Sequence, residues 1–296
     1  MKPVWLFDTE LRNSIILSSG TVRNDFDRQL AEAVGAVTLK SQKPKPVFGN
    51  PQPRICGIRK TDIIEIDSNY SIDNLDDEPG MVNRIGLQNC GVDKLIEKYV
   101  PVYREMDVRI IASIAGGSIA DYQYVLTRFG SCEDAFLGYE VNVSCPNVKD
   151  GLTFGSSPTM IRFLVQSLRH MTDKPLFVKL SPNVSNICEI ALAAIDAGAD
   201  GLSLINTIKV KAKMSNGREI EGGLSGPMIF PIACRLLSQV REALPDIPII
   251  AGGGVWCTKD VKKMLNLGAT AVSVGTLNFT RPDAVLNLIE DYNLLF

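Results

Sequence analysis

The stretch that decides the fold is Leu137-Gly138-Tyr139-Glu140-Val141-Asn142-Val143-Ser144-Cys145-Pro146-Asn147. Residues 137–141 form an apolar run that predicts a buried strand, and Pro146 with its polar neighbours predicts that a loop follows. Asparagine is a poor strand residue, and a buried amide needs hydrogen-bond partners. Cys145 between Asn142 and Asn147 therefore indicates a ligand site, in which the amides hold a flat polar ring and the thiol moves a proton; a buried packing residue is the alternative for Cys145.

Outward from this stretch, short apolar runs alternate with amphipathic segments along the whole chain. The predicted strands are residues 14–17, 36–39, 109–114, 138–143, 176–180, 201–205, 247–251 and 271–274. The predicted helices are residues 25–34, 92–105, 119–128, 158–170, 186–197, 227–243, 258–267 and 282–292. Strands that alternate with helices pair in parallel through right-handed crossovers. Eight such units predict an α/β fold, a closed (β/α)8 TIM barrel.

Polar residues and glycines follow each predicted strand. In a (β/α)8 barrel the carboxyl ends of the strands carry the functional residues. Gly252-Gly253-Gly254 follow the seventh strand and Gly275-Thr276 follow the eighth, where such barrels commonly bind a phosphate. Glycines let backbone N–H groups approach an anion closely. We therefore expect a phosphate group at these two loops; a plain turn is the alternative.

Two segments interrupt the pattern and predict loop insertions over the mouth of a single domain spanning residues 1–296. The first, around residues 42–82, contains the alternating run Ile63-Ile64-Glu65-Ile66-Asp67, which predicts a hairpin strand outside the barrel. The second, around residues 209–226, contains three lysines and an arginine, and predicts a charged surface hairpin rather than a binding patch. Ordered loops of this length often cover an active site.

Composition excludes several classes of protein. The chain has 296 residues and a net charge of −2, which gives no argument for nucleic-acid binding. No apolar run approaches the roughly 18 residues that span a bilayer, and the N-terminus does not resemble a secretory signal, so we expect a cytoplasmic protein without a membrane segment. Seven dispersed cysteines without a CxxC pair argue against disulfides and a metal site. A single histidine, His170, argues against a multi-histidine metal centre.

Five motifs together resemble those of class 1 dihydroorotate dehydrogenases. In chain order they are Asn83-Arg84-Ile85-Gly86-Leu87-Gln88-Asn89, Asn142-Val143-Ser144-Cys145-Pro146-Asn147, Val178-Lys179-Leu180-Ser181-Pro182, Ile205-Asn206-Thr207 and Gly222-Gly223-Leu224-Ser225-Gly226. The resemblance implies an FMN-binding barrel that oxidises (S)-dihydroorotate to orotate in pyrimidine (UMP) synthesis. It also implies that Cys145 is the catalytic base that takes the proton from C5, while the hydride from C6 passes to FMN.

The residue types suit this chemistry. Because no side chain accepts a hydride, forming the ring double bond requires a cofactor, and it also requires a base poised near neutral pH. A free thiol with a pKa of about 8.5 is a usable base once its surroundings tune it. Asparagine amides both donate and accept hydrogen bonds, which suits a ring with alternating N–H and C=O edges.

The resemblance also implies a set of binding residues. The substrate-binding residues would be Lys40, Asn83, Gly86, Leu87, Asn142, Asn147, Asn206 and Thr207. The cofactor-binding residues would be Ser19, Gly20, Lys40, Ser41, Asn142, Lys179, Ile205, Gly226, Gly253, Gly254, Gly275 and Thr276. Lys40 would lie between substrate and flavin, and Lys179 near the flavin N1/C2=O edge, where negative charge develops on reduction. The alternative for each lysine is an ion pair with a neighbouring acid.

Several motifs, among them Gly86-Leu87-Gln88-Asn89, resemble the B-type branch of the family. B-type enzymes pair with a second subunit that carries FAD and a 2Fe–2S cluster, and pass electrons to NAD. This chain has no cluster-ligand cysteine pattern and no GxGxxG fingerprint, so the NAD step would need such a partner. Two departures leave the electron acceptor open: residues 55–81 are longer than expected, and Ser113 stands where an asparagine is expected.

Three other interpretations compete with a B-type catalytic subunit. The first is an A-type enzyme, which is a homodimer that uses fumarate; a homodimeric core is also expected for the B-type. The second is a related flavin barrel that acts on another dihydropyrimidine, such as dihydrouracil. The third is a flavin-binding or scaffold protein without turnover.

Overall fold

The computed structural model describes residues 4–58, 63–65, 80–144, 154–214, 216–279 and 283–295. Eight parallel strands close into a barrel, as predicted, and every predicted strand is confirmed to within two residues at each end. In barrel order they are β3 (Ile15–Leu17), β4 (Ala36–Thr38), β8 (Ile110–Ile114), β9 (Gly138–Asn142), β10 (Leu176–Lys179), β11 (Gly201–Leu204), β14 (Ile249–Gly252) and β15 (Ala271–Val274), which pairs back with β3.

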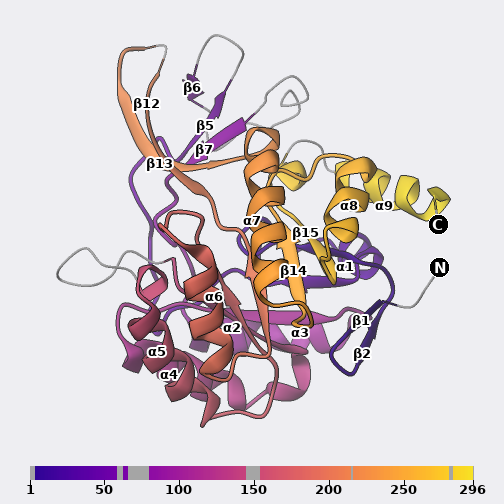
Figure 1. Ribbon diagram of the computed structural model, residues 1–296. Helices are drawn as coiled ribbons and strands as arrows, with labels where there is room; N and C mark the ends of the chain where they lie inside the picture. The colour runs from indigo at the N-terminus through magenta and orange to yellow at the C-terminus, as the bar shows by residue number, and fades with distance from the viewer. Residues whose placement is uncertain are drawn as a thin grey trace.

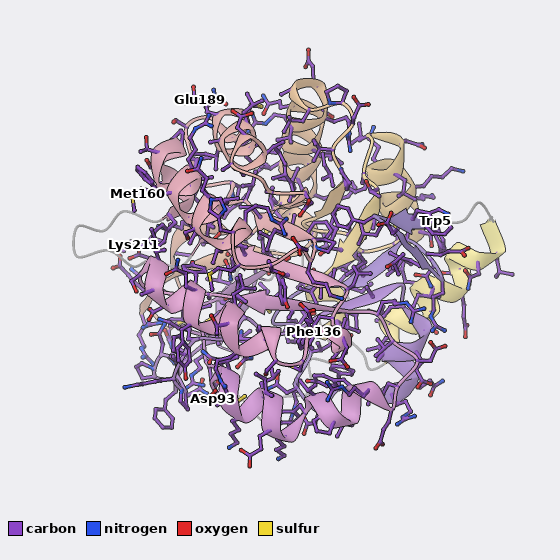
Figure 2. The ribbon with its side chains drawn as sticks, turned by 90° about the horizontal axis from the view of Figure 1, so that it is seen from below. Trp5, Asp93, Phe136, Met160, Glu189 and Lys211 are labelled. Carbon is purple, nitrogen blue, oxygen red and sulfur yellow. The ribbon has the colours of Figure 1, made fainter. Side chains whose placement is uncertain are left out.

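Helices lie around the outside of the barrel (Figure 1). They are α1 (Arg28–Ala33), α2 (Val92–Lys98), α3 (Val100–Arg104), α4 (Ile119–Gly130), α5 (Pro158–Arg169), α6 (Ile187–Asp196), α7 (Phe230–Ala243), α8 (Thr258–Asn266) and α9 (Ala284–Leu295). Ser118, Ser157 and Asn186 cap the N-termini of α4, α5 and α6 by accepting a backbone N–H of the first turn. Seen from below, Asp93 of α2 and Glu189 of α6 lie on the outer surface (Figure 2).

The prediction of one continuous helix over residues 92–105 is wrong. The chain forms α2 and α3 instead, with Tyr99 as the C-cap of α2. Pro101 explains the break, because a proline has no N–H to donate to the carbonyl of Glu97 and its ring collides with the preceding turn. The predicted helix over residues 227–243 similarly begins with a 3-10 turn, η4 (Pro227–Ile229), before α7 starts.

The lower half of the barrel interior is apolar. Inward-facing side chains of six strands form one cluster with Leu6 and Leu11: Ile16, Ala36, Ile111, Phe177, Ile250 and Ala271. Leu6 and Leu11 belong to the hairpin of β1 (Val4–Leu6) and β2 (Thr9–Leu11), which closes the barrel at the amino ends of the strands. The sequence did not predict this hairpin.

The upper half of the interior is polar. Because side chains alternate between the two faces of a strand, the residue two positions further along points inward again. At that height the strands carry Thr38, Ser113, Glu140, Lys179, Ser203 and Ser273. An apolar plug therefore lies beneath a polar floor at the carboxyl ends of the strands.

The two insertions pair with each other above this floor. They form a five-stranded sheet in the order β12 (Ile208–Lys213), β13 (Glu219–Ser225), β7 (Gly80–Asn83), β5 (Ile55–Ile58) and β6 (Ile63–Glu65), visible above the barrel in Figure 1. The predicted hairpin in residues 209–226 is confirmed as β12 and β13, and the strand predicted from Ile63 as β6, paired with β5. Among the described residues, no helix combines the length and apolar character needed to cross a membrane.

Candidate active site

A cavity of about 1480 Å³ opens at the carboxyl ends of the barrel strands, between the strand-end loops and the five-stranded sheet. Most of the binding residues predicted from the sequence line it: Ser19, Gly20, Lys40, Ser41, Asn83, Gly86, Leu87, Asn142, Lys179, Ile205, Asn206, Thr207, Gly253, Gly254, Gly275 and Thr276. Gly226 does not line the cavity itself; its carbonyl oxygen lies next to Gly254, which does. Cys145 and Asn147 lie outside the described residues.

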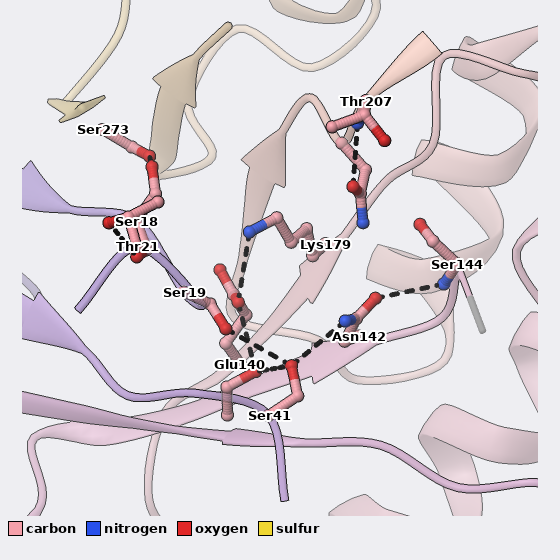
Figure 3. A network of polar contacts seen from close by, with 12 residues as sticks. Ser18, Ser19, Thr21, Ser41, Glu140, Asn142, Ser144, Lys179, Thr207 and Ser273 are labelled. Atoms are coloured by element: carbon pink, nitrogen blue, oxygen red, sulfur yellow. Dashed lines mark hydrogen bonds and ion pairs between the residues drawn. The ribbon is translucent and has the colours of Figure 1, made fainter. Parts of the chain in front are cut away.

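Ser41 is the centre of a hydrogen-bond network on the cavity floor (Figure 3). Its Oγ lies 2.8 Å from Oγ of Ser113 and 3.3 Å from Oγ of Ser19. It also accepts a hydrogen bond of 3.1 Å from Nδ2 of Asn142. The network thus joins the ends of four neighbouring strands: Ser19 follows β3, Ser41 follows β4, Ser113 lies in β8, and Asn142 ends β9.

Asn142 is held at both ends of its amide. While Nδ2 donates to Ser41, Oδ1 accepts the backbone N–H of Ser144 at 3.2 Å. The hydroxyl of buried Tyr122 donates to the backbone carbonyl of Asn142 at 2.8 Å. Among the described residues, the second N–H of the Asn142 side chain has no partner, so it can meet a ligand in an orientation that the protein fixes in advance.

Lys179 forms an ion pair with Glu140 at the floor (Figure 3). Its Nζ lies 3.5 Å from Oε1 of Glu140, and Oγ of Ser113 donates to the same oxygen at 3.3 Å. The side chain of Glu140 is 5% exposed and that of Lys179 is 13% exposed. The ion-pair alternative considered for Lys179 therefore holds, and Lys179 lines the cavity at the same time.

Lys40 has a different environment. Among the described residues, no acidic side chain lies within ion-pair distance of its Nζ, so the ion-pair alternative finds no support there. Burial and the nearby positive charge of Lys179 lower the pKa of Lys40. At the cavity floor Lys40 and Lys179 lie near one buried carboxylate, that of Glu140, which leaves an excess of positive charge there that suits an anionic ligand.

Part of the cavity rim is built by the hairpin of β12 and β13, by β7 and by the loop after β11. Oδ1 of Asn206 accepts the N–H of Thr207 at 2.8 Å, and the carbonyl of Thr207 accepts Nδ2 of Asn183 at 2.9 Å. Nδ2 of Asn83 donates to the carbonyl of Gly223 at 3.2 Å, which ties β7 to β13. The amides of Asn83 and Asn206 thus come from two distant segments to one side of the cavity.

Two consecutive residues at the edge of this rim have left-handed backbone conformations. Gly86 has φ of 73° and Leu87 has φ of 53°. Nδ2 of Asn89 donates to the carbonyl of Leu87 at 2.7 Å and helps to hold this turn. A non-glycine residue in this conformation is uncommon, and such residues cluster at binding sites.

The glycines at the ends of β14 and β15 serve two different purposes. Gly253 and Gly254 have φ of 119° and 83°, and a Cβ on Gly254 would lie 2.7 Å from the carbonyl oxygen of Gly226. The backbone itself therefore requires glycine there. A Cβ on Gly275 would meet no protein atom closer than 3.6 Å, so the fold does not require this glycine. The room beside Gly275 opens into the cavity.

A sequence model of the family described as "Dihydroorotate dehydrogenase" matches residues 69–294, most of the chain. The chain belongs to the dihydroorotate dehydrogenase family. Members of this family are oxidoreductases that depend on a flavin.

Named relatives support the class 1, B-type resemblance. The chain is 39% identical over 295 residues to the "Dihydroorotate dehydrogenase B (NAD(+)), catalytic subunit" of Alkaliphilus metalliredigens, covering 95% of this chain and 89% of the relative. It is 38% identical over 292 residues to proteins of the same name from Oceanobacillus iheyensis and Malacoplasma penetrans, covering 95% of this chain and 88% of each relative.

Three residues of this dihydroorotate dehydrogenase site were not predicted: Glu140, Ser113 as its donor, and Ser203. A signal for Glu140 was present, because an acid inside an otherwise apolar strand needs a partner. Ser203 of β11 lines the cavity with an Oγ that is buried and has no hydrogen-bond partner among the described residues. Nothing in its sequence context separates it from an ordinary strand serine.

Proposed function

We propose that this protein is the FMN-containing catalytic subunit of a B-type dihydroorotate dehydrogenase, a single barrel domain that oxidises (S)-dihydroorotate to orotate in UMP synthesis. The observation that carries the proposal is the meeting of Lys40, Lys179 and the amide of Asn142 in one cavity. In a chain of this family, that cavity suits a flavin stacked against an anionic pyrimidine.

The residues present fit FMN. Ser19, Gly20, Ser41 and Asn142 would flank its ring, with Lys179 at the N1/C2=O edge and Ile205 against the ring. The phosphate would lie at the strand-end loops, held by Gly253, Gly254, Gly275 and Thr276, with Gly226 supporting Gly254. Two structural facts support the fit. A Cβ on Gly275 would have room beside it, so the fold itself does not require glycine there, and the buried hydroxyl of Ser203 has no hydrogen-bond partner in the described part of the chain. FMN supplies the acceptor for the substrate's hydride.

The protein's own groups would bind and orient dihydroorotate. Lys40 offers a cation to the anionic substrate, and Asn83, Asn142, Asn147, Asn206 and Thr207 offer donors and acceptors to its ring edge and carboxylate. Gly86 and Leu87 would present backbone groups to the same ligand. Holding the ring in one orientation brings its C6–H to the flavin and its C5–H to the base, which converts binding energy into rate.

Cys145 would be the base. Its thiolate takes the proton from C5 beside the ring carbonyl, and the pair of electrons left behind forms the C5–C6 double bond as the hydride leaves C6. The resemblance to the family implies that Cys145 lies beside the substrate, and there the positive charge of Lys40 and Lys179 would help a thiolate to form.

Anaerobic reduction tests the proposal. The purified protein should be yellow, and its flavin absorbance should bleach when dihydroorotate is added. Cys145→Ala should retain the flavin and slow the bleaching by about a hundredfold or more. Cys257→Ser, at the exposed N-cap of α8, is the matched control and should bleach at the wild-type rate. A colourless protein, or a flavin that dihydroorotate never reduces, would reject the function in favour of another substrate or of binding without turnover.

We further propose that electrons leave through a second subunit with FAD and a 2Fe–2S cluster, on a homodimeric core. The name that the relatives carry, "Dihydroorotate dehydrogenase B (NAD(+)), catalytic subunit", supports this electron acceptor. Reduced protein alone should fail to reduce NAD and should do so once the partner is added. Rapid reoxidation by fumarate without a partner would instead indicate the A-type reaction. Bleaching by dihydrouracil but not by dihydroorotate would indicate the other pyrimidine substrate.

A further inference from the structure

Glu140 is the only buried acid among the residues that the structure describes, with 4% of the residue exposed. It lies in the middle of β9 and faces the barrel interior, one layer above the apolar plug. Removing a carboxylate from water is costly unless it is paired and hydrogen-bonded, and an apolar residue of similar size is often as stable or more so. Stability of the barrel therefore does not explain an acid at this position.

The contacts of Glu140 point to the cavity. A single oxygen, Oε1, receives both Lys179 Nζ at 3.5 Å and Ser113 Oγ at 3.3 Å. Ser113 continues to Ser41 at 2.8 Å, and Ser41 to Asn142 at 3.1 Å. Glu140 itself lines the cavity, so its charge lies close to whatever ligand Lys179 meets.

The charges at this floor are unequal. Lys40 and Lys179 carry two positive charges, and Glu140 neutralises one of them. Without Glu140, the ammonium of Lys179 would be drawn fully to the ligand, and the cavity would favour negative charge more strongly.

We propose that Glu140 is a positioning residue that holds Lys179 at the edge of the flavin site and limits how strongly the site favours the reduced form of the cofactor. This inference rests on the proposed function. Reduction places negative charge on the N1/C2=O side of the flavin, whereas the oxidised ring is neutral. A carboxylate beside Lys179 therefore weakens binding of the reduced form and leaves binding of the oxidised form nearly unchanged.

The test is the midpoint potential of the bound flavin, measured by equilibration with a reference dye under anaerobic conditions. In Glu140→Gln the charge is lost while the side chain keeps its length and its ability to accept from Ser113. The ratio of affinities for reduced and oxidised flavin should rise about tenfold, which corresponds to a potential about 30 mV more positive for a two-electron couple. Glu140→Met removes the charge without the hydrogen bonds and should shift the potential in the same direction.

Glu189→Gln is the matched control, since Glu189 lies on the exterior of α6 and should leave the potential unchanged (Figure 2). Retained flavin with an unchanged or more negative potential in either Glu140 variant would overturn the inference. A wild-type protein that binds no flavin would instead overturn the proposed function, so the two failures are distinguishable.

Discussion

Gly20 and Lys40 lie side by side at the carboxyl ends of the neighbouring strands β3 and β4. A Cβ atom on Gly20 would lie 3.0 Å from Nζ of Lys40, and Gly20 itself has φ of 83°. The ammonium group of Lys40 therefore rests against a stretch of backbone that only glycine forms without strain. The loop after β3 and the residue after β4 thus determine together where this cation lies.

Gly20→Ala should lower stability and weaken substrate binding together. The left-handed backbone costs an alanine about 1 kcal/mol, and the new methyl group displaces the end of Lys40. Urea unfolding measures the first effect, and the dihydroorotate concentration that gives half-maximal bleaching measures the second. Gly217→Ala is the control, because Gly217 has the same φ of 83° with no atom within 4 Å of its added Cβ. Equal substrate binding in both variants would contradict the contact with Lys40.

Lys40 should make the stability of the flavin-free protein depend on alkaline pH. Its pKa is lowered in the folded protein but stays near about 10.4 in the unfolded chain. Between these two pKa values the unfolded chain binds more protons, so the free energy of unfolding rises with pH through that window. At pH values below both pKa values, Lys40 is charged in the folded and the unfolded protein, and burying that charge lowers the free energy of unfolding by its full amount.

Lys40→Met should remove this contribution. Urea unfolding of the flavin-free protein from neutral pH to about pH 10.5 should show that the variant is more stable than wild type at neutral pH, with the difference shrinking as pH rises. Lys259→Met, an exposed lysine of α8, should follow the wild-type pH profile. A difference between Lys40→Met and wild type that grows with pH would contradict the lowered pKa.

Gly275→Ala should separate ligand binding from folding. No protein atom lies within 3.6 Å of the added Cβ, so the flavin-free protein should unfold within about 0.5 kcal/mol of wild type. The methyl group enters the cavity where the phosphate is proposed, so FMN affinity measured by flavin fluorescence should fall about tenfold, or about 1.4 kcal/mol. Gly254→Ala should lose stability even without FMN, since its Cβ would lie 2.7 Å from backbone atoms of Gly226 and Phe230.

Gly223→Ala should affect the substrate more than the cofactor. Its Cβ would overlap the side chain of Thr207, and forcing a methyl into such a place typically costs 1–3 kcal/mol. The displaced Thr207 should raise the KM for dihydroorotate several-fold while FMN affinity remains close to wild type. Gly130→Ala, at the end of α4 with nothing within 4 Å of its Cβ, should change neither quantity.

The barrel was predictable because its strands carry a strong local signal. Runs such as Ile110–Ile114 are mostly apolar and buried on both faces, as is typical of buried parallel strands, and polar loops bound them. The hairpin of β1 and β2 was missed because each strand is three residues long and each contributes a single buried side chain to the core, Leu6 and Leu11. A strand of three residues is too short to show an alternation of apolar and polar residues.

The five-stranded sheet was missed for another reason. Pairing of Val82 with Leu224 joins segments about 140 residues apart, and neither segment contains information about the other. In contrast, the break between α2 and α3 could have been foreseen from Pro101.

The candidate site was predictable as a set of positions rather than as a set of contacts. The resemblance predicted that Lys40, Asn142 and Lys179 share one site, and all three line the same cavity. Whether Lys179 meets a ligand or an acid could not be decided from the sequence. The structure shows that it meets Glu140. Strand register, which aligns Lys179 with Asn142 and places Glu140 between Ser113 and Lys179, is set by the closure of the whole barrel.

Because an apolar plug lies beneath a polar floor, the two layers of the barrel interior can be changed separately. Phe177 and Lys179 belong to one strand and point the same way, yet the first packs in the apolar plug and the second pairs with Glu140 beside the cavity. Substitutions at the upper positions should therefore change what the cavity binds, while the lower positions keep the cylinder closed. New reactions could be grafted onto this scaffold without rebuilding it.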